Sequence, residues 1–373
     1  MFLYLVLTFS CMYIVRYFLL FLLKSPHQKV RAGYQEDLIF PFEQEFELYY
    51  ANVSTNSMKV RMCLEEAGLA YKSHVVKLPK SGSFETKTSS FLQINPAGTV
   101  PVLLHNGHPV YESSEQLIYI AKYVGKNNIL IPSDLQTQKC MMRFLEITSV
   151  FAHEIMDDVD KALEHRVGNC IYFFSLPLFI AMAARFNVKI KFYTLLQTIY
   201  MLLINTCSRK QLIQTCIALF GLNTIKYIHP MRKIIMKMQK YLLDHLMHLE
   251  QHLKENSSKK IIEVANRNDG RPIEHQYLHG NLVFIDDMCW AAIFYRLKNA
   301  CWLDDISTKK FPLVHQYWRS LQCLPSFKKV TMFSEKESVE ERLVQSQIRM
   351  WKRTQPWFLQ LYTGNISELK KEA

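Results

Sequence analysis

The sequence predicts an α/β domain followed by an all-α helical-bundle domain, with a helical insertion in the second domain and a transmembrane helix at the amino terminus. Three observations support this fold class. Residues 46–126 alternate between strand and helix patterns, residues 134–330 show helical spacing of apolar residues, and residues 1–24 are almost entirely apolar. With 373 residues, 49% of them hydrophobic and 21% charged, the chain is long enough for two globular domains with extensions.

Residues 1–24 predict a membrane anchor. As a helix that rises about 1.5 Å per residue, this segment crosses a hydrocarbon core of about 30 Å. Arg16 opposes insertion by about 3 kcal/mol at most, whereas each Leu, Ile, Phe and Val favours it by about 0.3–0.6 kcal/mol. The segment lacks the basic start and the small-residue cleavage site of a signal peptide. Because Lys24, Lys29 and Arg31 follow it, the positive-inside rule predicts that the rest of the chain faces the cytosol.

The elements of the α/β domain follow a predicted linker at residues 25–45. Phe46–Tyr50 predicts a strand, and the apolar spacing after a polar loop predicts a helix that ends at Gly68. Tyr71–Leu78 predicts a second strand. Two more strands are expected on either side of His105–His108, because Asn-Gly is the strongest short hairpin signal.

The turn and the helix around this hairpin carry groups suited to a peptide ligand. An X-Pro bond becomes cis at a cost of about 0.5–1 kcal/mol, so Val100-Pro101 can turn the chain. The turn leaves the amide and carbonyl of Val100 available to bind a ligand. Ser113 is predicted to cap the next helix, with Gln116 completing a capping box, and the N-terminus of that helix attracts a carboxylate. The Glu112 carboxylate can form an ion pair with an ammonium group of the ligand. An ordinary capped helix is the alternative interpretation.

This ordered set of residues resembles the glutathione transferase superfamily. The resemblance implies a thioredoxin-like N-terminal domain, an all-α C-terminal domain, glutathione as a substrate and a small apolar electrophile as its acceptor. It also implies that Val100, Pro101, Glu112 and Ser113 bind glutathione. The residues that carry it are Leu48–Tyr50, Ser54–Ser57, Lys59–Arg61, Leu64–Leu69, Asn95-Pro96, Val100–Leu103 and Glu112-Ser113.

Three hydroxyl groups are candidates for activating the thiol. Ser54 is the first choice for the catalytic residue, since it matches the serine of serine-type transferases in the loop before the helix. Tyr50 is the alternative, at the position of the tyrosine-type enzymes. Ser57 is predicted to be the helix N-cap. The alternative to a catalytic role is that all three hydroxyls only form hydrogen bonds with backbone groups.

The second domain is expected to span residues 134–330. Apolar residues recur at helical spacing in 134–166 and again in 231–255, and the long interval between them predicts an insertion at about 167–230. Residues 331–373 predict a charged amphipathic tail. The helices after residue 283 resemble the closing helices of the transferases.

Phe284 replaces the family's usual Ser or Thr cap three residues before Asp287. We expect Asp286 to substitute for that cap.

The insertion, with Lys59–Arg61, Leu78-Pro79 and Tyr295–Lys298, resembles the ganglioside-induced differentiation-associated protein branch of the superfamily. That resemblance implies the mitochondrial outer membrane and a part in mitochondrial dynamics and redox balance. The endoplasmic reticulum is the alternative location. In that branch the membrane helix follows the transferase body, whereas here the apolar segment comes first. The alternative to an enzyme is a non-catalytic scaffold or redox sensor on an organelle membrane.

The net charge and the cysteine pattern limit the kinds of binding partner that we expect. The net charge is +12, but no nucleic-acid motif accompanies the scattered basic residues, so membrane lipid is the expected partner and nucleic acid is not. The nine cysteines show no zinc-ligand spacing, and His153-Glu154 with Asp157-Asp158 is interpreted as a solvated helix face. We therefore expect no metal. A homodimer is the remaining partner prediction, since transferases commonly dimerise.

Overall fold

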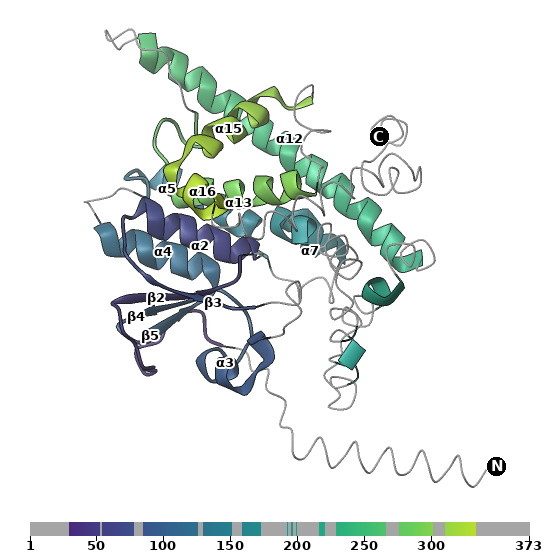
Figure 1. Cartoon of the computed structure of the whole chain (residues 1–373). Helices are drawn as coiled ribbons and strands as arrows, with labels where there is room; N and C mark the ends of the chain where they lie inside the picture. The colour runs from purple at the N-terminus through teal and green to yellow at the C-terminus, as the bar shows by residue number, and fades with distance from the viewer. Residues whose placement is uncertain are drawn as a thin grey trace, which may run out of the picture. The chain divides into compact units, whose positions relative to one another are not determined.

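The computed structural model describes nine stretches of the chain and four single residues, and these carry most of both predicted domains (Figure 1). The chain divides into two compact units: residues 1–31, 76–99 and 179–227 belong to one, and residues 32–75, 100–178 and 228–373 belong to the other. The described residues are 30–52, 54–77, 85–125, 130–150, 159–172, 216–220, 229–265, 276–300 and 310–332, together with 192, 195, 196 and 199.

A five-stranded mixed sheet forms the base of the larger unit, in the order β1-β5-β4-β2-β3. Strand β2 pairs with β3 in parallel through a helical crossover and with β4 in antiparallel fashion. The predicted hairpin is confirmed, because Asn106 and Gly107 take positive φ angles of 51° and 82° between β4 and β5. The strands are β1 Gly33–Tyr34, β2 Phe46–Tyr50, β3 Lys72–Val75, β4 Val102–His105 and β5 His108–Tyr111.

The predicted linker is wrong for its second half. Gly33 and Tyr34 pair with β5, and the backbone of Phe40 donates to Gly107 O over 2.9 Å. This part of the chain therefore adds an edge strand to the sheet. Its two-residue strand has no periodic pattern in the sequence, and its structure comes from the partner strand.

Helices α2 (Thr55–Glu66) and α4 (Ser113–Val124) pack together on one face of the sheet (Figure 1). The predicted stop of α2 is confirmed: Gly68 takes φ 68°, and Leu69 N donates to Leu64 O over 3.0 Å, which satisfies a carbonyl of the last turn. Leu48, Val60 and Leu117 are 0% exposed in the core between these layers.

The second domain is all-α in the described residues. Helix α13 packs against α2 and α5, so the two domains share a core within this unit, and Trp290, Phe294 and Tyr317 are at most 1% exposed there. The helices are α5 Leu135–Thr148, α7 Val159–His165, α12 His229–Ala265, α13 Ile285–Asn299, α15 Pro312–Cys323 and α16 Pro325–Met332.

The start of α13 corrects one prediction. Asp286 does not cap the helix, because its side chain contacts His279 at 2.7 Å. Asp287 has the capping role instead: its Oδ2 accepts from Phe284 N over 2.9 Å, and its Oδ1 accepts from Leu278 N and the Tyr317 hydroxyl. The carboxylate therefore fixes the turn before the helix without a capping side chain at Phe284.

The smaller unit is described over residues 76–77 and 85–99, with a few helical residues beyond. A 3₁₀ turn at Glu85–Lys87 leads into α3 (Ser89–Ile94), whose N-cap Thr88 accepts from Phe91 N.

Several predictions fall partly or wholly outside the described residues. These are the anchor at 1–24, most of the insertion at 167–230 and nearly all of the tail at 331–373. Across the described helices, none combines the length and apolar character that a bilayer span needs. Where the insertion begins, Val167, Cys170 and Ile171 are at most 1% exposed, so these residues belong to the core of the helical domain.

Candidate functional site

Three chain segments meet at one end of the central strands, where β2 and β5 end and β4 begins; we call this end the edge of the sheet. Strand β4 runs antiparallel to both β2 and β5, so the last residues of β2 and β5 lie beside the first residue of β4. In register terms, Tyr49 pairs with Val102, and Leu103 pairs with Val110. The loop into α2, the turn before β4 and the start of α4 consequently gather at this edge. Each of them contains residues that the sequence predicted for the site.

Ser54 is the N-cap of α2. Its backbone is extended, with φ −86° and ψ 119°, and its Oγ accepts from Ser57 N over 3.2 Å. The side chain is half-buried. A hydroxyl that accepts one hydrogen bond retains its own proton for donation, so capping leaves Ser54 able to donate to a thiolate near the helix N-terminus.

The prediction that Ser57 caps α2 is wrong. Ser57 is 0% exposed and lies inside the first turn, where its Oγ accepts from Ala51 N over 3.3 Å. The helix begins three residues earlier than expected because Ser54 already supplies the capping oxygen. Tyr50, the alternative catalytic residue, ends β2 with 5% exposure, and the guanidinium of Arg61 covers its ring at 4.4 Å.

The Val100–Pro101 peptide bond is cis, as the sequence predicted. Gln116 holds this turn to the rest of the edge: its Nε2 donates to Pro101 O over 3.1 Å and to Val110 O over 2.7 Å. Gln116 is 0% exposed, so both bonds are made away from water. The turn and the end of β5 are thereby joined through the first turn of α4.

The predicted capping box of Ser113 and Gln116 is wrong. Ser113 is the first helical residue, and the N-cap position belongs to Glu112, which makes no side-chain capping bond. Gln116 cannot reach back to the cap because the carbonyls of Pro101, in the turn, and Val110, in β5, hold its amide. Glu112 has φ 67° and ψ 124°, a conformation that non-glycine residues rarely adopt and that is concentrated at functional sites.

The electrostatic character of the edge follows from these positions. The Glu112 side chain is exposed beside the N-terminus of a twelve-residue helix, while Ser113 is 7% exposed. A carboxylate next to unpaired helix amides can hold a ligand that carries both an ammonium and a carboxylate. Behind the edge, burial raises the pKa of Tyr111 to about 12, so this phenol stays protonated at neutral pH.

A second cluster was not predicted. Cys140, His252 and His279 bring their ligand-type atoms within 4.8 Å of one another, although they belong to three distant parts of the chain. Sequence spacing gives no sign of it, because neither histidine lies near the cysteine or in a known ligand motif. This cluster lies in the helical domain.

The comparisons with known proteins match the part of the chain that contains the first of these sites. Residues 53–122 match the family model described as Glutathione S-transferase, N-terminal domain. Glutathione S-transferase 1 of Dianthus caryophyllus is 34% identical over 93 residues, which are 25% of this chain and 40% of that protein. Glutathione S-transferase U21 of Arabidopsis thaliana is 37% identical over 78 residues, or 21% of this chain and 33% of that protein. The chain thus spans less than half the length of these curated relatives.

Among solved structures, Beta-etherase LigF from Sphingobium sp. strain SYK-6 has a TM-score of 0.55 to this chain at 19% identity. The similarity covers 78% of this chain and 100% of that one. It shows a shared fold, with an α/β domain followed by a helical domain.

Proposed function

Because the chain carries an N-terminal domain of the glutathione transferase superfamily, we propose that it binds glutathione and adds its thiolate to a small apolar electrophile. The observation that carries this proposal is the convergence at one sheet edge of Ser54, the Val100-Pro101 turn and the Glu112-Ser113 helix start. Each segment offers the group that one part of the tripeptide requires.

The tripeptide would lie across the edge in an extended form. The γ-glutamyl ammonium group would meet the Glu112 carboxylate, and the neighbouring carboxylate would accept bonds from Ser113 and the first amides of α4. The cysteinyl backbone would pair with the backbone of Val100, as an added strand pairs with a sheet edge. This pose places the thiol toward the α2 N-terminus, where Ser54 lies.

Ser54 can supply the required activation. A thiol of pKa about 8.5 must fall by about two units to ionise at neutral pH, which requires about 2.7 kcal/mol. A hydrogen bond from Ser54 Oγ to the charged sulfur contributes about 1.5–3 kcal/mol, and a helix N-terminus about 0.3–1 kcal/mol. The thiol proton passes to solvent. The sulfur lone pair then forms a C–S bond with the electrophile, whose leaving group or displaced π electrons take up the negative charge.

The membrane location is a further part of the proposal and rests on sequence. The apolar segment at 1–24 would anchor the chain with its body on the cytosolic side, and the net charge of +12 favours an anionic lipid surface. An anchored enzyme meets apolar electrophiles at the concentration they reach in the bilayer. The mitochondrial outer membrane is the proposed location, with the endoplasmic reticulum as the alternative, and a homodimer is the proposed assembly.

Binding is tested by retention of the detergent-solubilised full-length chain on immobilised glutathione. Glu112→Gln should weaken binding about 10-fold, because it removes a charge-assisted bond of about 1.5–3 kcal/mol. Glu115→Gln is the matched control, since Glu115 is also an exposed acidic residue in the first turn of α4. Equal losses in the two variants would contradict the assigned role of Glu112.

Turnover is tested with a generic aromatic electrophile. Ser54→Ala should lower the rate by about 10- to 100-fold and also remove the α2 cap, whereas Ser54→Asp keeps a capping oxygen and repels the thiolate. If Ser54 acts on the thiolate, both variants lose turnover but only Ser54→Ala loses about 1 kcal/mol of stability. Retention of the wild type on glutathione without turnover would instead favour a non-catalytic scaffold or sensor.

A further inference from the structure

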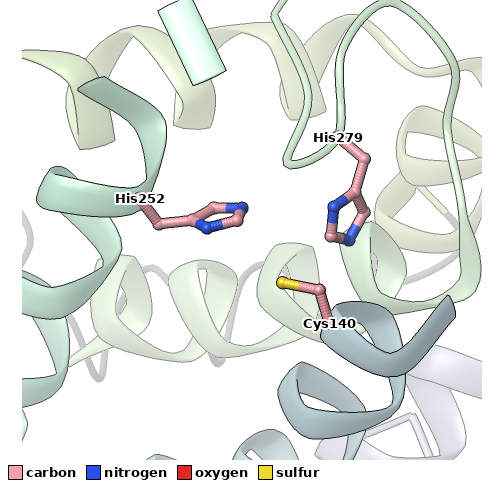
Figure 2. A group of neighbouring side chains, drawn as sticks. All are labelled: Cys140, His252 and His279. Carbon is pink, nitrogen blue, oxygen red and sulfur yellow. The ribbon is translucent and has the colours of Figure 1, made fainter. Parts of the chain in front are cut away.

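We propose that Cys140, His252 and His279 form a Zn²⁺ site in the helical domain. Figure 2 shows the three side chains pointing toward a common position, Cys140 from α5, His252 from α12 and His279 from the turn before α13. One sulfur and two imidazole nitrogens form a ligand set that suits zinc and does not suit Mg²⁺ or Ca²⁺. Three protein ligands leave a fourth position for water.

The spacing of the ligand atoms fits a zinc ion. Bonds of about 2.3 Å to sulfur and about 2.0–2.1 Å to nitrogen place tetrahedral ligands about 3.3–3.6 Å apart. The ligand-type atoms of Cys140, His252 and His279 lie within 4.8 Å of one another. Small side-chain rotations that move these atoms by about 1 Å would bring them to the distances of a tetrahedral zinc site. The two imidazole rings lie edge to face, at a centroid distance of 5.7 Å and an interplanar angle of 78°, which lets both direct a nitrogen at one point.

Neighbouring groups already orient both histidines. Nε2 of His279 lies 2.7 Å from Asp286 Oδ2, which leaves Nδ1 for a metal, and both side chains are at most 3% exposed. Nε2 of His252 lies 3.1 Å from Leu278 O, which can accept its proton and leave Nδ1 for a metal, while the nearby Asn256 Nδ2 donates to the same carbonyl over 2.6 Å. Carboxylate and carbonyl partners of this kind fix the ring position and tautomer of metal-bound histidines.

An aromatic ring shields the cluster. Phe144 lies one helical turn after Cys140 on α5, and its ring contacts His252 edge-on with a centroid distance of 4.8 Å. The ring of His279 lies 6.1 Å from the same phenylalanine. Partial exclusion of solvent around the ligands strengthens metal binding. A bound ion would connect α5, α12 and the turn at residues 276–280.

The site is tested with Co²⁺ and Zn²⁺ on the full-length chain after treatment with a chelator. Cobalt bound by a thiolate gives a sulfur-to-cobalt charge-transfer absorption band, and we expect this band with one equivalent of metal. Cys140→Ala should abolish the band and weaken Zn²⁺ binding by more than about 100-fold. Cys323→Ala and His248→Gln are matched controls at exposed positions, the latter on the same helix as His252, and both should keep the band.

A positioning variant separates a metal site from a chance cluster. Asp286→Asn leaves all three ligands in place, so the band should remain while Zn²⁺ affinity falls about 10- to 100-fold. Cys140→Ser, which changes one atom, repeats the test if the alanine variant folds poorly. The proposal is overturned if the wild type gives no thiolate–cobalt band, or if the band survives in Cys140→Ala.

Discussion

Asp287 is expected to be the most sensitive polar residue of the helical domain. Its side chain is 0% exposed and accepts three hydrogen bonds, from Leu278 N at 3.0 Å, Phe284 N at 2.9 Å and the Tyr317 hydroxyl at 2.7 Å. Asp287→Ala leaves three buried donors unpaired, each at about 1–3 kcal/mol. Burial and the charge of Asp286 raise the pKa of Asp287 to about 7, so removing the carboxylate also relieves some unfavourable energy. We therefore expect a net loss of about 3–4 kcal/mol in the free energy of unfolding.

Urea unfolding of the full-length chain, followed by tryptophan fluorescence to which the buried Trp290 and Trp318 contribute, measures this loss. Tyr317→Phe removes one donor and should cost about 1–2 kcal/mol, because Asp287 keeps its two backbone partners. The double variant should cost less than the sum of the two single ones, since both remove the same bond. A loss below about 1 kcal/mol for Asp287→Ala, or equal losses for the two single variants, would refute this account.

Three further predictions concern the α/β domain and the start of the insertion. Burial alone would raise the pKa of Glu47, but hydrogen bonds from two backbone amides and from His74 lower it below 4.5. The carboxylate therefore adds stability above pH 4.5, and this stability is lost as the pH falls through the lower pKa of the folded state. Glu47→Gln should flatten that part of a pH–stability curve. Glu112→Gly should raise thermal stability, because glycine accepts φ 67° without strain, while glutathione retention falls. Gly168→Ala should lower stability by about 1–3 kcal/mol or more in urea unfolding, because its Cβ would lie 2.3 Å from Ser149 O; a neutral result would show that the backbone there can yield.

Local signals explain which elements could be predicted. The strand Phe46–Tyr50, the stop at Gly68 and the hairpin at Asn106-Gly107 depend on short-range periodicity or on residues that accept positive φ, and all three were predicted. The strand at Gly33–Tyr34 was missed because only its pairing with β5 defines it. The starts of α2 and α4 were misplaced because capping depends on backbone angles that residue type does not fix.

The cluster of Cys140, His252 and His279 shows a different limit of sequence-based prediction. Each of its residues looks ordinary in the sequence, and the ligand set exists only after α5, α12 and the turn before α13 have packed together. The expectation that no metal binds was an inference from spacing. Spacing detects only sites whose ligands are close in the chain, so it is silent about ligands that distant helices supply.

The backbone of Glu112 gives an independent reason to regard the edge of the sheet as a binding site. A non-glycine residue at φ 67° and ψ 124° costs about 1–3 kcal/mol, and its exposed side chain does not repay that cost through core packing. Glycine would make the same turn, and Glu112 O accepts from Gln116 N at the start of the helix. The strain is understandable if the carboxylate must extend from this position toward a ligand held at the N-terminus of α4. The strained backbone and the predicted ligand chemistry thus point to the same residue.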